Sequence, residues 1–221
     1  MLFFLIFSLF SSIQIVNGYE AFFAVMVTNP TVVQQVNQIQ QNLTSADRQF
    51  VSFLHNTSYL HVHLNAFEIN DTQLPKILSD LPKVLCNVSS SIPVMFAGTE
   101  IRANRTLFGK MNAMSSSVIT TVHKTILNYF NESGIDSLDK WQIFQSKMDI
   151  VELDERKHDD LLKIMSNQTF RLSTGDFVKD IVMFKAAPSG FFHDEIGRFQ
   201  LQPCSTKLLE LLTNRIYVDY F

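Results

Sequence analysis

Apolar residues follow two spacings along the chain after residue 18. In some segments they form short runs or recur at every second position, as in buried or half-buried strands. In others they recur at every third and fourth position, as in helices with one buried face. The expected strands are 20–27, 59–69, 92–102, 106–112, 142–153, 177–187 and 190–201, and the expected helices are 31–43, 73–85, 115–133 and 156–165. This mixed order predicts an α+β fold with antiparallel strand pairs and helices between them.

The segment 59–69 alternates most clearly. Leu60, Val62, Leu64 and Ala66 fall on one face, and Tyr59, His61, His63 and Asn65 fall on the other. Because side chains two apart on a strand point the same way, we expect the two imidazoles side by side on the polar face. Two neighbouring histidines can act on one phosphate or bind one metal ion.

The first residues have the layout of a secretory signal peptide. Residues 2–10 (LFFLIFSLF) carry no charge, and the residues after them turn polar and end at Gly18. Val16 and Gly18 are small enough for a cleavage site, so we expect residues 1–18 to be removed. The alternative is an N-terminal membrane anchor, for which the apolar run is short beside the span of about 20 residues that a bilayer requires.

Asn-x-Ser/Thr sequons, the acceptor sites for N-glycosylation, also indicate secretion. They stand at Asn42, Asn56, Asn70, Asn87, Asn104, Asn131 and Asn167. Glycans are bulky and polar, so each occupied site must face solvent. We therefore expect a secreted, extracellular glycoprotein that passes through the endoplasmic reticulum.

The chain contains two cysteines, Cys86 and Cys204. In an oxidising compartment they could close one long loop as a disulfide, and without a C-x-x-C spacing they do not suggest a metal or redox site. The alternative is two unrelated buried thiols, because a disulfide needs Cα atoms within about 7 Å of each other.

Composition indicates one folded domain without strong charge. Hydrophobic residues make up 46% of the 221 residues, and 18 basic against 21 acidic residues give a net charge of −3. These values exclude a disordered chain and disfavour binding to long nucleic acids, which needs clustered Lys and Arg. No linker or second apolar stretch of membrane length divides the chain, so we expect one domain over 19–204 and a tail, 205–221, that forms a short helix.

Several stretches, in order along the chain, resemble the 2H phosphoesterase superfamily. EAFFAVMVTNPTVVQQVNQIQQNL (20–43) resembles its opening strand and helix, LHVHLNAFEI (60–69) and IFQSKMDIVEL (143–153) its two motif strands, 98–135 its middle strands and long helix, and 178–201 its closing hairpin. The similarity is greatest to the phosphoesterase-like domain of A-kinase anchoring proteins. It implies a bilobed fold in which two antiparallel sheets face a central groove and the helices lie outside.

In that family each lobe supplies one His-x-Thr motif. The two histidines act as general base and general acid on a phosphodiester, the threonines hold phosphate oxygens, and neither a metal nor another cofactor is needed. His61 matches the first histidine, but His63 replaces the first threonine, and Lys147 and Asp149 stand at the second histidine and threonine. A lysine ammonium can hold a phosphate but is a poor proton shuttle near neutral pH, and a carboxylate repels phosphate. The resemblance therefore implies a catalytically degenerate domain that binds a phosphorylated or nucleotide ligand, or an extracellular protein.

Other interpretations remain open from the sequence. His61 with His63 or Lys147 could still supply both proton transfers, which would give an active, metal-independent phosphodiesterase on RNA ends or cyclic phosphates. A metal ion held by His61, His63 and Asp149 is a third possibility. In the simplest case His63 belongs only to a polar strand face, and Lys147 and Asp149 form a surface salt bridge.

His123-Lys124-Thr125 also matches the His-x-Thr pattern. It falls inside the helix expected over 115–133, where side chains two apart diverge by about 200°. The match is therefore a coincidence, and His123 is expected beside the buried stripe of this helix.

Overall fold

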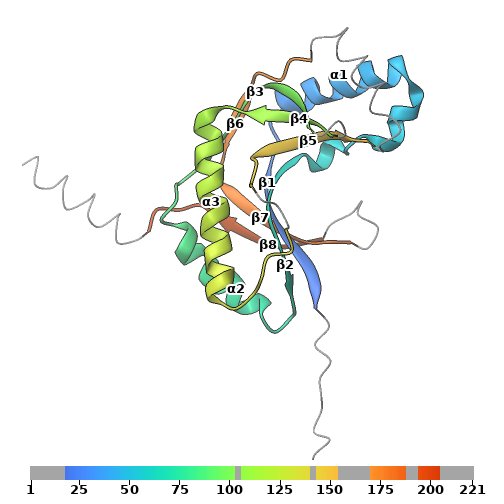
Figure 1. The fold of residues 1–221 in the computed structure, drawn as a ribbon. Coiled ribbons are helices and arrows are strands. Elements are labelled where there is room, and N and C mark those ends of the chain that lie inside the picture. The colour runs from blue at the N-terminus through green and yellow to red at the C-terminus, as the bar shows by residue number, and fades with distance from the viewer. Residues whose placement is uncertain (1–17, 103–105, 140–142, 154–169, 188–193, 205–221) are drawn as a thin grey trace, which may run out of the picture.

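The computed structural model describes residues 18–102, 106–139, 143–153, 170–187 and 194–204 (Figure 1). Its strands are β1 (Tyr19–Met26), β2 (His61–Ile69), β3 (Ile92–Arg102), β4 (Thr106–Met111), β5 (Lys147–Glu152), β6 (Gly175–Val178), β7 (Asp180–Lys185) and β8 (Asp194–Gln200). Its helices are α1 (Pro30–Ala46), α2 (Leu74–Leu85) and α3 (Ala113–Glu132), with two short 3₁₀ helices, η1 (Arg48–Phe53) and η2 (Thr57–Tyr59), after α1.

The strands form one curled sheet in the order β6-β3-β4-β5-β2-β1-β7-β8 (Figure 1). Each neighbouring pair is antiparallel. Two halves of four strands meet at β5 and β2, where Val62 pairs with Met148. The predicted α+β fold with two antiparallel sheets is confirmed, and the structure adds that the two sheets are continuous through this contact.

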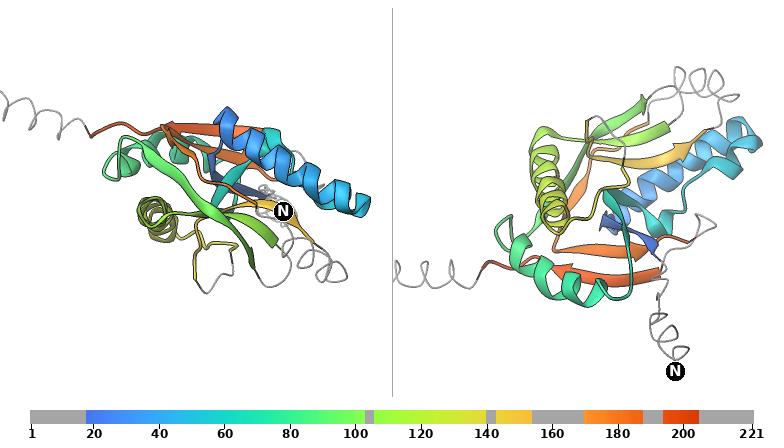
Figure 2. Two further views of the ribbon diagram at one scale, coloured as in Figure 1. Left: turned by 90° about the horizontal axis from the view of Figure 1, so that it is seen from above. Right: turned by 60° about the horizontal axis from the view of Figure 1, so that its bottom comes forward.

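Helices α1 and α3 begin at residues that satisfy their first backbone amides. The Asn29 side chain accepts hydrogen bonds from the Thr31 and Val32 amides at 2.9 and 3.3 Å, and Asn112 accepts one from the Ser115 amide at 2.8 Å. Asparagine is a strong N-cap for this reason. Each helix buries one face in the same hydrophobic core, with Val32, Val36, Ile39 and Leu43 on α1 and Ile119, Val122, Ile126 and Phe130 on α3. Figures 1 and 2 show the two helices far apart, over different parts of the curled sheet.

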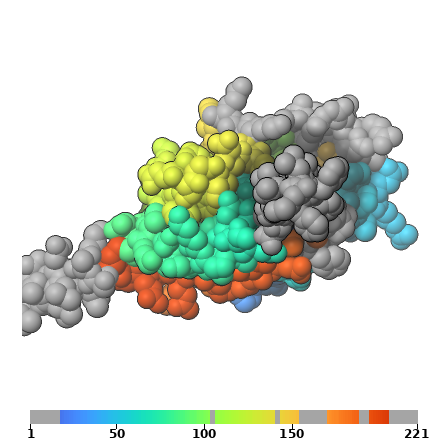
Figure 3. Space-filling view, turned by 90° about the horizontal axis from the view of Figure 1, so that it is seen from below, coloured from blue at the N-terminus to red at the C-terminus, as the bar shows by residue number. Residues whose placement is uncertain are grey.

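Helix α2 lies between α3 and the β7–β8 hairpin, as the space-filling view shows (Figure 3). Its Ile77, Leu81 and Leu85 are buried. Cys86 at the end of α2 forms a disulfide with Cys204, which follows β8, and their Cα atoms are 4.9 Å apart. The predicted pairing is therefore present, and it ties the last described segment of the chain to α2.

The structure corrects the strand expected over 177–187. This segment is interrupted at Lys179: β6 pairs with β3 in one half of the sheet, and β7 pairs with β1 in the other. A continuous apolar pattern cannot show that the chain leaves one half for the other, because Val178 of β6, which is partly buried, packs against the same core that buries Ile181 of β7. The strand expected over 142–153 is also shorter, since β5 begins at Lys147.

Other sequence predictions lie outside the described residues. These are the signal segment up to residue 17, the helix over 156–165, residues 188–193 of the closing hairpin and the tail 205–221. Across the described ranges, none of the helices combines the length and apolar character that crossing a membrane demands.

Candidate functional site

Strand β2 points His61 and His63 away from the main core. Val62 and Leu64, which alternate with them, are 0% exposed and belong to that core, while both histidines are partly exposed. We call the opposite side of the sheet, on which the two imidazoles lie, the histidine face. The prediction that both rings share one face is confirmed.

A bulge in β2 changes which residues follow the histidines on that face. Ala24 of β1 pairs with His63, but Phe23 pairs with Asn65, so Leu64 has no cross-strand partner on β1. An extra residue in one strand reverses the alternation beyond it. Asn65 is therefore buried on the core side, and Ala66 lies on the histidine face, opposite to the sequence prediction for both. The sequence prediction assumed that side chains alternate along the whole strand without a bulge.

The His61 ring is held by a backbone carbonyl. Its Nδ1 lies 2.7 Å from the Tyr59 oxygen, and because a carbonyl only accepts, Nδ1 carries the proton. The basic nitrogen is then Nε2. The ring also contacts Phe22 of β1, with centroids 5.7 Å apart.

The His63 ring is oriented by Asp139, a residue that the sequence analysis missed. His63 Nε2 lies 3.3 Å from Asp139 Oδ1, and the Ala66 amide donates to Asp139 Oδ2 at 2.6 Å. The carboxylate fixes the proton on Nε2, so Nδ1 is the basic nitrogen of His63 and the two rings have opposite tautomers. No motif links Asp139 to β2, since 76 residues separate it from His63.

Strand β5 places Lys147 and Asp149 beside the two histidines. Val62 pairs with Met148, and both are 0% exposed in the core. Antiparallel pairing therefore brings His63 next to Lys147 and His61 next to Asp149 on the histidine face. Lys147 and Asp149 form an ion pair with each other, and the Lys147 ammonium lies 5.5 Å from the centre of the Phe108 ring.

A small apolar cluster adjoins the histidines on β1, β2 and β7. It contains Phe22, Ala24, Ala66, Val182 and Phe184, and it is separate from the main core. Phe22 stacks on His63 at 5.5 Å with 17° between the ring planes, and on Phe184 at 5.3 Å. The imidazoles therefore pack beside a buried aromatic cluster rather than on an open polar strand face.

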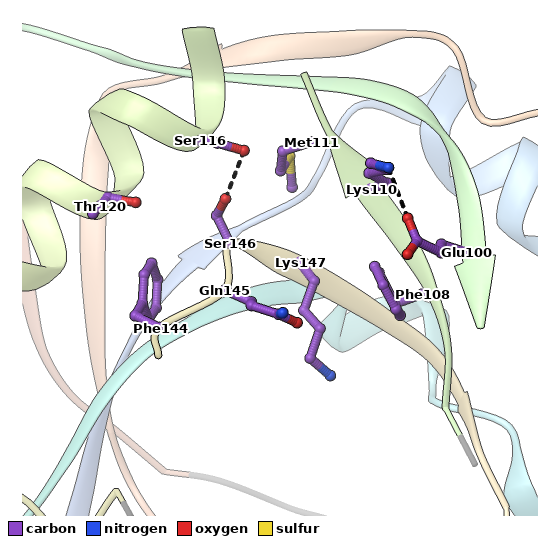
Figure 4. Close-up of a pocket in the computed structure, with 10 residues that line it drawn as sticks. All are labelled: Glu100, Phe108, Lys110, Met111, Ser116, Thr120, Phe144, Gln145, Ser146 and Lys147. Carbon is purple, nitrogen blue, oxygen red and sulfur yellow. Dashed lines mark hydrogen bonds and ion pairs between the residues drawn. The ribbon is translucent and has the colours of Figure 1, made fainter. Parts of the chain in front are cut away.

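A cavity of about 380 Å³ opens beside Lys147 (Figure 4). It is lined by Glu100, Phe108, Lys110, Met111, Ser116, Thr120, Phe144, Gln145, Ser146 and Lys147. Two pairs of lining side chains interact with each other. Lys110 Nζ lies 2.8 Å from Glu100 Oε2, and Ser146 Oγ lies 2.9 Å from Ser116 Oγ. The lining mixes polar with apolar side chains, and it includes Lys147, which the sequence predicted as a site residue, and Lys110, which it did not.

His123 is a structural residue, as its helix position predicted. Its Nδ1 donates to the Leu64 carbonyl at 3.0 Å, and its ring stacks on Phe144 with centroids 4.0 Å apart. Burial lowers the pKa of His123 below its ordinary value, so the folded protein favours the neutral ring. The hydrogen bond from His123 holds the backbone of Leu64, the bulged residue of β2.

Comparison with known proteins identifies the family. The family model described as the AKAP7 2'5' RNA ligase-like domain matches residues 19–186. The chain belongs to this family. The uncharacterized protein C35A5.6 of Caenorhabditis elegans is 56% identical over 211 residues, which are 90% of this chain and 88% of the relative.

Solved structures of other proteins share the fold of this AKAP7-like domain. The protein TT0787 of Thermus thermophilus has a TM-score of 0.61 at 14% identity and covers 83% of this chain and 98% of its own. Escherichia coli LigT, solved with 3'-AMP, has a TM-score of 0.58 at 12% identity, with 84% and 99% covered. The family match and this fold confirm the predicted resemblance to the 2H phosphoesterases.

The AKAP7-like domain departs from the expected His-x-Thr pairs at three of four positions, and those positions share one face. His61 is retained, whereas His63, Lys147 and Asp149 stand where the resemblance implied Thr, His and Thr. Within the described part of the chain, no group of three or more His, Cys, Asp or Glu side chains is placed to hold a metal ion. His61, His63 and Asp149 are thus neighbours along two strands without forming a ligand set.

The sequons of the domain that the structure describes lie at its surface. Asn56, Asn87 and Asn131 are exposed, and Asn42 and Asn70 are partly exposed. Asn104 and Asn167 lie outside the described residues. His193, another histidine of the closing hairpin, lies outside them as well.

Proposed function

We propose that this domain binds a phosphate ester on the histidine face without hydrolysing it efficiently. The observation that carries the proposal is the ion pair between Lys147 and Asp149, next to His61 and His63. The ammonium supplies a positive charge for a phosphate, and the imidazoles can donate hydrogen bonds to its oxygens. Strand β5 carries no histidine that could act as the acid–base partner of His61 across the two halves of the sheet.

Asp149 limits how strongly the site attracts an anion. It neutralises Lys147, and Asp139 adds a second carboxylate behind His63. Escherichia coli LigT, which shares the fold, was solved with 3'-AMP and with phosphate, and this supports a nucleotide as the first ligand to test.

Calorimetric titration with 3'-AMP tests the binding function. We expect saturable binding to the mature protein, weakened about tenfold or more by His61→Ala and by Lys147→Ala, because each removes a charge-assisted contact. Lys83→Ala is the matched control: this lysine is also paired with a carboxylate, Asp80, at 2.9 Å, but on helix α2. Absence of binding, or equal binding by all variants, contradicts the proposal.

The alternative function is a metal-independent phosphodiesterase acting on RNA ends or cyclic phosphates. The observation that favours it is the His61 tautomer: donation from Nδ1 to Tyr59 leaves Nε2 as a base. Cleavage of 2',3'-cyclic nucleotides that is lost in His61→Ala but unchanged by a chelator would establish this enzyme. Cleavage abolished by the chelator would instead support a metal site at His61 and His63.

We also propose that the mature protein is a secreted glycoprotein that can meet an extracellular protein partner. The disulfide between Cys86 and Cys204 suits an oxidising compartment, and the surface position of Asn56, Asn87 and Asn131 suits glycosylation. Expression in animal cells tests this: the medium should contain a protein that begins after Gly18 and loses mass on treatment with an N-glycosidase. Retention of residues 1–18 on a membrane-bound product would favour the anchor instead.

A further inference from the structure

The cavity beside Lys147 has more binding chemistry than the proposed phosphate site uses. It extends from the histidine face over β4 and the first turns of α3 (Figure 4). Lys110 of β4 and Lys147 of β5 are direct cross-strand partners. Like charges directly opposite each other on a sheet are destabilising. Each of the two lysines has its own carboxylate, Glu100 for Lys110 and Asp149 for Lys147.

Hydroxyl groups complete the wall of the cavity opposite the lysines. Ser116 and Thr120 lie in the first two turns of α3, and Ser146 precedes β5. In the Ser116–Ser146 hydrogen bond one hydroxyl donates and the other accepts, so one O–H of the pair remains to donate to a ligand. The N-terminal end of α3 also favours a negative charge nearby. These groups can bind an anion, and they line a cavity rather than a flat surface.

We propose that this cavity holds a second phosphate of the ligand whose first phosphate lies at His61, His63 and Lys147. This inference rests on the proposed function and extends it. Lys110 would contact the second phosphate, Lys147 would lie between the two, and Ser116 or Ser146 would donate a hydrogen bond to it. Glu100 holds the Lys110 ammonium in place when the cavity is empty and competes with the phosphate when it is filled.

The spacing of the strands indicates which phosphates fit. His63, Lys147 and Lys110 lie on β2, β5 and β4, which are consecutive in the sheet, and neighbouring strands are about 4.8 Å apart. The phosphates of a diphosphate share one oxygen and lie closer together than that. Successive phosphates of a short oligonucleotide are separated by a sugar and lie further apart. His63 and Lys110, at the two ends of this row, are two strand spacings apart, so separated phosphates suit the row better than adjacent ones.

Binding of three adenine ligands to the full mature protein tests the second subsite. The ligands are AMP with one phosphate, ADP with two adjacent phosphates, and a 5'-phosphorylated dinucleotide with two separated phosphates. We expect the dinucleotide to bind about tenfold more tightly than AMP, and ADP to gain less. Lys110→Ala should remove the advantage of the dinucleotide and leave AMP binding unchanged. Glu100→Gln should increase that advantage, because it removes the competing carboxylate.

The outcomes separate this inference from the proposed function. Lys83→Ala is again the control, and equal melting temperatures of all variants exclude unfolding as the cause. If AMP binds but the dinucleotide gains nothing, or gains equally in Lys110→Ala, the second subsite is wrong and the first stands. If Lys110→Ala weakens binding of the dinucleotide while His61→Ala weakens binding of none of the three ligands, the second subsite stands and the proposed function is wrong. If none of the ligands binds, both are wrong.

Discussion

His63 Nε2 lies 3.3 Å from Asp139 Oδ1, and the other oxygen of the same carboxylate accepts the Ala66 amide hydrogen at 2.6 Å. Asp139 thus joins the histidine to the backbone just beyond the β2 bulge. The Asp139 side chain is only 13% exposed, so this contact is screened less than a surface pair. It sets the ring orientation and the tautomer of His63.

Asp139→Asn should invert the His63 tautomer. The asparagine oxygen would keep the Ala66 amide as its donor, which turns the asparagine NH₂ towards His63 and makes Nε2 an acceptor. Two-dimensional NMR of the imidazole nitrogens should show protonated Nδ1 in the variant and protonated Nε2 in the wild type. Asp136→Asn, three residues earlier, is the control. The same His63 tautomer in both proteins would mean that Asp139 does not position the ring.

Restoring both His-x-Thr motifs should create phosphodiesterase activity. The triple variant His63→Thr, Lys147→His and Asp149→Thr supplies the groups that the resemblance to 2H phosphoesterases implies. Because general acid–base catalysis typically contributes at least about 100-fold, we expect turnover of 2',3'-cyclic nucleotides to rise by that factor or more over the wild type.

The control for this gain is the same triple variant with His61→Ala, which should stay inactive. A restored activity that persists without His61 would contradict its assignment as the base. A wild type that already turns over as fast as the triple variant would show that the natural residues are not degenerate.

The disulfide should contribute strongly to stability. Cys86 and Cys204 are 118 residues apart, and a loop of that length corresponds to about 5 kcal/mol of lost unfolded-chain entropy. We expect Cys86→Ser, Cys204→Ser and the double variant to lower the free energy of unfolding by similar amounts of a few kcal/mol, as measured by urea denaturation. Losses below about 1 kcal/mol, or clearly additive losses, would argue that the bond is absent from the native protein.

His123 should make the protein less stable in acid. Burial lowers its pKa in the folded state, whereas the unfolded chain takes up a proton below about pH 6.5. Unfolding therefore binds a proton in this range, so the stabilisation is complete above pH 6.5 and is lost as pH falls through the folded pKa.

The variant His123→Gln keeps a donor for the Leu64 carbonyl but does not titrate. Between pH 7 and pH 5 its free energy of unfolding should fall less steeply than that of the wild type, by up to about 1.4 kcal/mol per pH unit. Urea denaturation at several pH values measures both slopes. Parallel curves for the two proteins would show that His123 is not the group responsible.

The sequence by itself determined the local structure and part of the chemistry. The spacing of apolar residues predicted β1 to β4 and the three helices, because period and capping act within a few residues. The same local rule placed His61 and His63 on one face of a strand and excluded His123 from that face. The order of the segments indicated the family, and the two cysteines allowed only one intramolecular pair.

Only the tertiary structure decided what lies beside these residues. The bulge at Leu64, the division of 177–187 between two halves of the sheet, and the approach of Asp139 to His63 all depend on pairing between distant segments. So does the cavity that joins Lys147 to Lys110. Pairing of this kind is fixed by the burial of many side chains in one shared core, and no local pattern records which strands become neighbours.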